Sequence, residues 1–187
     1  AHCVTIGLPN VPSGSTSALS IGGSDYTIVN DVTYLQNSVT GATKYALGSN
    51  IEASTIANFA PINSFSGKFN GLGHSVNNLT IDTLALSAVG AGLFGKITGI
   101  LSNVGIVDAS IKSVGAGNFV GTLVGQYSPP TIATLSNNYA TGGSVDGGNG
   151  AGSFVGGLVG QVTIVTGDIS NNYAKGVNAS NTGAGSY

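Results

Sequence analysis

Charge is the scarcest feature of this sequence. Charged residues make up 6% of the chain, against roughly 25% in ordinary globular domains, and arginine is absent. Without arginine there is no bidentate clamp for phosphate or carboxylate, and the lysines are scattered along the chain. A formal charge of -2 also leaves no basic stripe. We therefore expect no nucleic-acid partner and no anionic ligand.

Cysteine and long apolar runs are equally scarce. The single cysteine, Cys3, excludes an intramolecular disulfide, and we interpret it as a small half-buried residue rather than half of an interchain bridge. No apolar run approaches the about 18 residues of a membrane helix, and no charged segment followed by an apolar one opens the chain. We expect no membrane insertion, and any export signal or anchor is expected to lie outside these residues.

Glycine and small polar residues are abundant instead. The chain has 31 glycines, only 5 prolines and 41% apolar residues, which indicates one sizeable core and a backbone of tight turns. Because ionised groups are so few, Ser, Thr and Asn must supply most of the surface polarity. Such a composition is typical of extracellular β-structures.

An asparagine recurs at a matching place in four segments. These are "VNNLTIDT" from Val76, "LSNVGIVD" from Leu101, "LSNNYATG" from Leu135 and "ISNNYAKG" from Ile169. In each, an aliphatic residue is followed two positions later by one of the asparagines Asn78, Asn103, Asn137 and Asn171. We expect these side chains to lie at an inward corner and to form a structural amide ladder, with a ligand groove as the alternative.

Three apolar segments flanked by glycine form a second set. They are "GAGLFGK" around Leu93, "VGTLVGQ" around Leu123 and "VGGLVGQ" around Leu158. Short segments of this kind are typical of buried strands between sharp corners, and helical periodicity is absent from them. We therefore predict that the three leucines belong to a structural ladder of stacked strands.

The spacing between repeats predicts a stack of coils. Asn103, Asn137 and Asn171 follow one another at intervals of 34 residues. A β-solenoid with roughly three short strands per coil explains this interval, because coils must match at their strands but can extrude loops at one corner. The extruded loops are predicted in "QYSPPTIAT" and "QVTIVTGD". Their candidate contact residues are Tyr127, Ser128, Pro129, Pro130, Thr163 and Val165.

The pairing of "GGLVG" with "ISNNYAKG" resembles the GLUG repeat of large secreted bacterial surface proteins of the filamentous-haemagglutinin and adhesin type. Upstream, "FSGKFNGLGHSVNNLTI" is similar to the segment that precedes such repeats. The resemblance implies an all-β, right-handed parallel β-helix over residues 25–187, with GLUG-like repeats at about 89–187. Residues 1–24 match less and are predicted to be an irregular N-terminal segment or the edge of a neighbouring module.

Catalytic groups are hard to find. Glycosidic hydrolysis needs two carboxylates about 5–10 Å apart, and along the chain no two acids lie closer than six residues. Only Asp82 and Asp108 are expected to become neighbours in stacked coils, as a like-charged surface pair. We interpret His74 as a turn histidine bonded to local backbone rather than as a base or metal ligand. We predict no catalytic residue, no cofactor and no metal site, and hence no enzyme.

Two tyrosines occupy equivalent places in the last two repeats. Tyr139 and Tyr173 are expected to stack as an aromatic ladder, with a sugar-binding platform as the alternative.

The expected function is a non-catalytic structural or adhesive module: a rod-like solenoid segment that is secreted or displayed on a bacterial cell surface. Its expected partner is a host-surface or matrix component, glycans included. One alternative is a self-assembling extracellular filament subunit, because open solenoid ends expose unpaired strand edges. The other is a carbohydrate-binding or carbohydrate-active β-helix.

Overall fold

The computed structural model describes residues 6–83, 90–130, 132–163, 166–185 and 187, and within them the chain winds into a parallel β-solenoid. The predicted fold class is confirmed by five parallel sheets, each of which takes strands from successive coils. Cys3 lies outside the described residues.

Each parallel sheet runs along the solenoid. The first contains β3 (Thr27–Val29), β4 (Lys44–Leu47), β7 (Lys68–Asn70), β12 (Ile100–Ser102), β17 (Ile132–Ser136) and β22 (Thr166–Ser170). The second contains β5 (Ile51–Glu52), β8 (Ser75–Asn77), β13 (Gly105–Val107), β18 (Tyr139–Thr141) and β23 (Tyr173–Lys175). The third contains β9 (Thr80–Thr83), β14 (Ser110–Ser113), β19 (Ser144–Asp146) and β24 (Asn178–Ser180). The fourth contains β10 (Gly90–Ala91), β15 (Phe119–Gly121) and β20 (Phe154–Gly156). The fifth contains β6 (Ile62–Phe65), β11 (Phe94–Ile97), β16 (Val124–Tyr127) and β21 (Val159–Val162).

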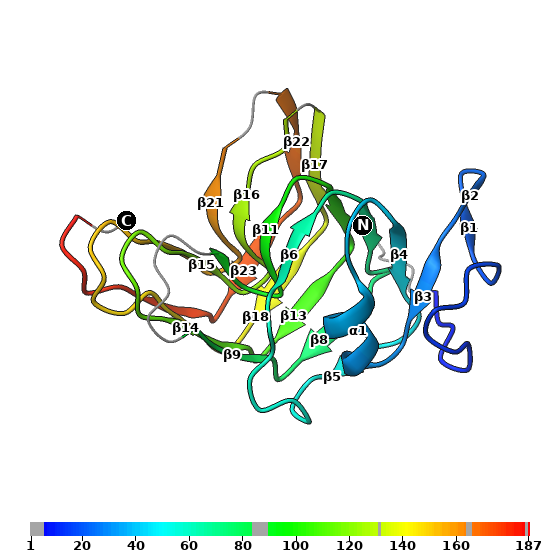
Figure 1. The fold of residues 1–187 in the computed structure, drawn as a ribbon, viewed down its shortest axis with the longest axis horizontal. Coiled ribbons are helices and arrows are strands. Elements are labelled where there is room, and N and C mark those ends of the chain that lie inside the picture. Colours follow the sequence, from blue (N-terminus) through cyan, green and yellow to red (C-terminus); the bar gives the residue numbers. More distant parts are fainter. Residues whose placement is uncertain (1–5, 84–89, 131, 164–165, 186) are drawn as a thin grey trace.

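Strands of successive coils lie side by side, as Figure 1 shows for β6, β11, β16 and β21. Three successive coils consist of β7–β11, β12–β16 and β17–β21, and each of them contains five strands rather than roughly three. The segment from Leu101 contains a corner at Asn103 between β12 and β13 and a second corner at Asp108 after β13, where the backbone adopts left-handed angles with φ of 58° and 52°. Asparagine and aspartate tolerate this region better than other non-glycine residues, so they make the corners between strands.

The strand register removes Asn78 from the predicted asparagine ladder. Val76 pairs with Ile106, which places Asn78 at the same corner as Asp108 and one corner beyond Asn103. The sequence motif around Val76 resembles the one around Leu101 only because both corners need a residue that accepts a positive φ, which is 55° at Asn78.

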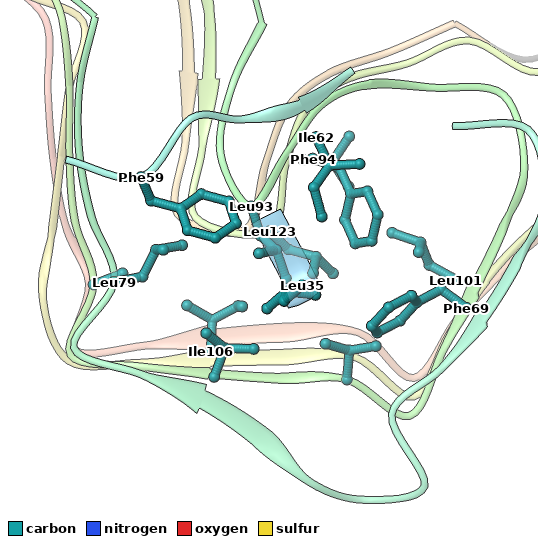
Figure 2. Packing of buried hydrophobic residues seen from close by; sticks show 14 of the residues in the cluster. Leu35, Phe59, Ile62, Phe69, Leu79, Leu93, Phe94, Leu101, Ile106 and Leu123 are labelled. Carbon is teal, nitrogen blue, oxygen red and sulfur yellow. The ribbon is translucent and has the colours of Figure 1, made fainter. Parts of the chain in front are cut away.

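The inside of the coils is a continuous apolar core. Figure 2 shows Phe59, Phe69 and Phe94 directed inward together with leucines from several coils. The Phe69 and Phe94 rings lie 5.3 Å apart in an edge-to-face arrangement. Full burial of one such side chain contributes about 1.5–3 kcal/mol, so these side chains hold the coils together.

One helix, α1 (Val32–Ser38), lies against the first coils (Figure 1). Asp31 begins it as N-cap, and its carboxylate accepts a hydrogen bond of 2.7 Å from the Tyr34 N–H. The helix buries Val32 and Leu35 in the core. The sequence reading missed this helix, although an N-cap aspartate and apolar residues three apart are its usual signal.

Residues before the first coil pack onto it. The strands β1 (Ser20–Ile21) and β2 (Ser24–Asp25) form an antiparallel hairpin. The Leu8 N–H donates to the Gly48 carbonyl at 2.6 Å, and the Ile28 N–H donates to the Ser15 carbonyl at 2.9 Å. Residues 6–24 therefore contact the same solenoid as the coils that follow.

Candidate functional site

The three leucines of the glycine-flanked segments occupy one column of the core. Phe94 pairs with Val124 and Val124 with Val159, so the preceding residues Leu93, Leu123 and Leu158 stack on one another. Their side chains are buried. They are packing residues of the solenoid, as their position between glycine corners suggests.

The first asparagine of each repeat sits at the outer corner between two strands. Asn103, Asn137 and Asn171 follow register-matched strand ends and have φ of 58°, 56° and 55°. The Asn103 side chain donates to the Asn70 amide oxygen at 3.0 Å, whereas Asn137 and Asn171 are exposed. These residues turn the backbone, and they do not form the inward ladder that the sequence predicted.

The inward amide ladder is formed by the second asparagine of "SNNY". Asn138 is fully buried, and its Nδ2 donates to the Asn172 Oδ1 at 3.0 Å and to the Leu101 carbonyl at 3.3 Å. Its Oδ1 accepts the Val104 N–H at 3.0 Å. Each asparagine thus satisfies backbone groups of the coil before it, as a buried polar side chain requires.

Sequence reasoning missed Asn138 and Asn172 because it looked for an asparagine common to all repeats. Position 104, which matches Asn138, is Val104, so the inward amide appears only in the last two repeats. The doubled "NN" in those two repeats was the available signal.

The two predicted loops contain fewer residues than the sequence suggested. Strand β17 pairs with β22 from Ile132 opposite Thr166 onward, so most of the extruded chain continues the sheet. Figure 1 shows β17 and β22 reaching beyond the rest of the solenoid at this corner. Of the described residues, 128–130 follow β16 and Thr163 follows β21 outside the strands.

The predicted contact residues fall into different environments. Pro130 and Thr163 are exposed, Ser128 is half-buried and Pro129 is buried. Val165 lies outside the described residues. Tyr127 belongs to β16 and is 0% exposed, so it is a core residue and not a contact.

Burial also changes the chemistry of Tyr127. Its hydroxyl approaches the Thr134 backbone without forming a hydrogen bond, and burial raises the pKa of Tyr127 to about 12. A neutral phenol with a high pKa and no access to solvent is not available to a partner.

The predicted tyrosine ladder is confirmed. Tyr139 and Tyr173 are paired residues of β18 and β23, and their rings stack with centroids 5.6 Å apart and 12° between the ring planes. A second ladder connects Phe119, Phe154 and Tyr187, with centroid distances of 5.7 and 5.6 Å. The inner ring faces of both ladders cover one another.

One column of the third sheet combines acidic and basic residues. The register places Asp82 opposite Lys112 and Lys112 opposite Asp146, so acid and base alternate along this column. Asp108 lies at the preceding corner, and the expected pairing of Asp82 with Asp108 is wrong because the aligned coils were shifted by one corner. The Asn78 side chain donates to both Glu52 carboxylate oxygens at 3.0 Å, which lowers the pKa of Glu52.

His74 is buried against the N-terminal segment. Its Nε2 lies 2.9 Å from the Ile6 carbonyl oxygen, and its Nδ1 lies 3.3 Å from the Asn50 side-chain oxygen. The ring therefore contacts chain that is distant in sequence, while the His74 backbone N–H donates to the Gly71 carbonyl of its own turn at 2.8 Å, as the turn interpretation predicts. Among the described residues, no three His, Cys, Asp or Glu side chains are grouped closely enough to hold a metal ion.

Helices long and apolar enough to cross a membrane do not occur in the described part of the chain.

Comparisons with known proteins support the fold. Halomucin from Haloquadratum walsbyi is 31% identical over 129 residues, which are 60% of this chain and 1% of halomucin. The crystal structure of a candidate immunoglobulin A1 protease from Bacteroides ovatus matches with a TM-score of 0.51 at 21% identity, over 80% of this chain and 57% of that one. At this identity the likeness shows the fold alone. No family model matches the chain, so membership of the GLUG-repeat family stays a prediction.

Proposed function

We propose that this chain is a non-catalytic structural module of a large extracellular surface protein, in which it forms a stiff solenoid segment. The observation that carries the proposal is the use of the repeated residues. Leu93, Leu123 and Leu158 fill the core, and Asn138 and Asn172 satisfy backbone groups of neighbouring coils. Repetition of this kind preserves a scaffold.

The similarity to halomucin supports the extracellular part of the proposal. This chain matches a very small part of that relative, as expected for one module of a long protein. A surface rich in Ser, Thr and Asn with 6% charged residues is also compatible with an exposed module.

Surface labelling of intact cells of the source organism tests this location. Antibodies against the solenoid are expected to label unpermeabilised cells or to recover the protein from the medium. Labelling that appears only after permeabilisation would contradict an extracellular module.

Adhesion is the finer part of the proposal, and we assign it to the extruded corner. Pro130 and Thr163 are exposed there, next to strands that extend beyond the rest of the coil. The double variant Pro130→Ala with Thr163→Ala is expected to lower binding to immobilised matrix proteins or glycans, while Ser110→Ala, at an exposed residue of β14, serves as the control. Equal binding by both variants and the parent chain would contradict the assignment of adhesion to this corner.

The absence of catalysis is tested with the substrate class that the solved neighbour suggests. Incubation of the chain with immunoglobulin A1 and with a panel of polysaccharides is expected to leave both intact. Cleavage by the parent chain that is lost when one acidic residue is replaced by its amide would contradict a purely structural module.

End-to-end filaments receive less support from the fold. Head-to-tail stacking needs two open ends, and α1 with its buried Leu35 lies over the first coils. The sugar-platform alternative is weakened by the mutual stacking of the ladder rings.

A further inference from the structure

The segment before the first coil forms a strap, residues 6–24, over the outer face of the first sheet. Ile28 of β3 and Ala46 of β4 alternate with core residues of the same strands and therefore face outward. Together with Tyr26 and Leu72 they form a small apolar cluster that is separate from the main core. The partly buried strap residues that pack against this cluster are Leu8, Val11, Leu19 and Ile21. The strap therefore shields an apolar face on the outside of the coil.

Backbone and side-chain hydrogen bonds join the start of the strap to the coils. The Ile6 N–H donates to the Leu72 carbonyl at 3.4 Å, and the Leu8 N–H donates to the Gly48 carbonyl at 2.6 Å. The buried ring of His74 adds a side-chain contact at the same place, because its Nε2 lies 2.9 Å from the Ile6 carbonyl oxygen. One side chain of the solenoid thus contacts the strap where the strap begins to follow the coil.

Both nitrogen atoms of the His74 ring face oxygen atoms that only accept hydrogen bonds. Nε2 faces the Ile6 carbonyl, and Nδ1 lies 3.3 Å from the Asn50 Oδ1. The orientation of the Asn50 amide is fixed independently, because its Oδ1 also accepts the Ser75 N–H at 3.1 Å. A neutral imidazole has one N–H and satisfies one of the two oxygens, whereas a protonated ring donates to both.

The surroundings of the ring contain few titratable groups. No residue of the strap is titratable. Glu52 is the one acid or base in the segments that hydrogen-bond to His74, and its carboxylate accepts from the Asn78 side chain. These segments are residues 6–8, 48–52, 70–73, 75–77 and 103–105. In the adjacent apolar cluster, burial raises the pKa of Tyr26 above 10.0, so this phenol is neutral wherever histidine titrates. These segments therefore place no cation against a protonated His74.

We propose that His74 is a pH-sensitive latch, which holds the strap against the first coils when its ring is protonated. The protonated ring donates to the Ile6 carbonyl and to the Asn50 side chain, whereas a neutral ring leaves one of these buried oxygens without a donor. Closure of the strap therefore takes up a proton. Acidification favours the closed strap, and a rise in pH through the usual range of histidine, about 6.5, weakens it and uncovers the apolar face of β3 and β4.

Two NMR measurements on the whole chain test the latch. The 15N shifts of the imidazole report the protonation of His74 directly. Hydrogen exchange of the Leu8 amide, corrected for the intrinsic rate at each pH, reports closure of the strap. Protection of this amide is expected to be about 3- to 10-fold higher at about pH 5.5 than at about pH 7.5, because a charged donor makes a stronger hydrogen bond than a neutral one. The Leu123 amide, which donates to the Leu158 carbonyl, is the internal reference and should keep the same protection at both pH values.

Variants separate the latch from other effects of pH. His74→Gln keeps an N–H donor but cannot take up a proton, so protection of the Leu8 amide is expected to become the same at both pH values. His2→Gln removes the other histidine of the chain and is expected to keep the pH dependence of the parent. Three outcomes would overturn the proposal: a His74 ring that stays neutral down to about pH 5.5, protection of Leu8 that does not rise on acidification, or a pH dependence that persists in His74→Gln.

Discussion

Two consecutive asparagines in each of the last repeats have opposite tasks. Asn137 makes an exposed corner with a φ of 56°, whereas Asn138 is buried and bonds to two neighbouring coils. The difference follows from the geometry of the turn: a left-handed residue rotates the next side chain from the outside to the inside of the coil. Residue identity alone does not reveal which asparagine points inward.

Substitutions at these two residues should therefore lower the free energy of unfolding by different amounts. Asn138→Ala leaves the Val104 N–H and the Leu101 carbonyl without partners and is expected to lower the free energy of unfolding by about 2–4 kcal/mol. Asn137→Ala should cost about 1 kcal/mol through its left-handed backbone, and Asn137→Gly close to nothing. Urea unfolding of the three variants measures the order, and an equal cost for Asn138→Ala and Asn137→Ala would contradict it.

Tyr127 makes stability depend on alkaline pH. Its pKa is raised from 10.0 to about 12 in the folded chain, so above about pH 10 the unfolded state loses this proton first. The contribution is complete below pH 10 and is lost as the pH rises towards 12. Tyr127→Phe is expected to flatten the fall in unfolding free energy between pH 9 and 12 without destabilising the chain at pH 7, since the hydroxyl has no hydrogen bond. An unchanged pH profile in this variant would show that Tyr127 does not titrate in this way.

At the scale of elements, the helix and the extruded strands depart most from the repeat. Helix α1 has 7 residues, too few to be stable alone, and its formation depends on burying Val32 and Leu35 against the first coils. Strand β22 has 5 residues, whereas β12 in the same sheet has 3. The additional residues at this corner therefore lengthen the sheet rather than form a loop. Both elements take their form from neighbours that are distant in sequence.

The contribution of α1 can be measured by shortening its buried side chain. Leu35→Ala is expected to destabilise the chain by about 2–5 kcal/mol, because Leu35 is 0% exposed. Thr33→Ala, on the exposed side of the same helix, should change stability by less than about 0.5 kcal/mol. Thermal and urea unfolding compare the two, and a similar small effect for both would show that the helix does not hold the first coils.

At the scale of the whole molecule, stability comes from packing and hydrogen bonds rather than from charge. The chain contains 5 basic and 7 acidic side chains, and the buried core runs through successive coils. Exposed ion pairs contribute about 0–1 kcal/mol each and are screened by salt.

Stability should consequently respond little to ionic strength. Raising NaCl from about 0.05 to 0.5 M is expected to change the free energy of unfolding by less than about 0.5 kcal/mol. Denaturant titrations at the two salt concentrations provide the measurement. The slope of the unfolding free energy against denaturant concentration should be the same at both, which serves as the control. A change of several kcal/mol would mean that charges hold the coils together.

The solenoid class, the 34-residue interval of the last repeats and the tyrosine ladder could be predicted from the amino-acid sequence. These follow from composition and from residues that recur at fixed spacing, since stacked coils place equivalent residues beside one another. The register could be seen only in the folded chain: it separates Asn78 from Asn103, buries Tyr127 and places the inward ladder at Asn138 and Asn172. The physical reason is that a single left-handed corner changes which side chains point inward, and only the pairing of whole coils fixes where that corner falls.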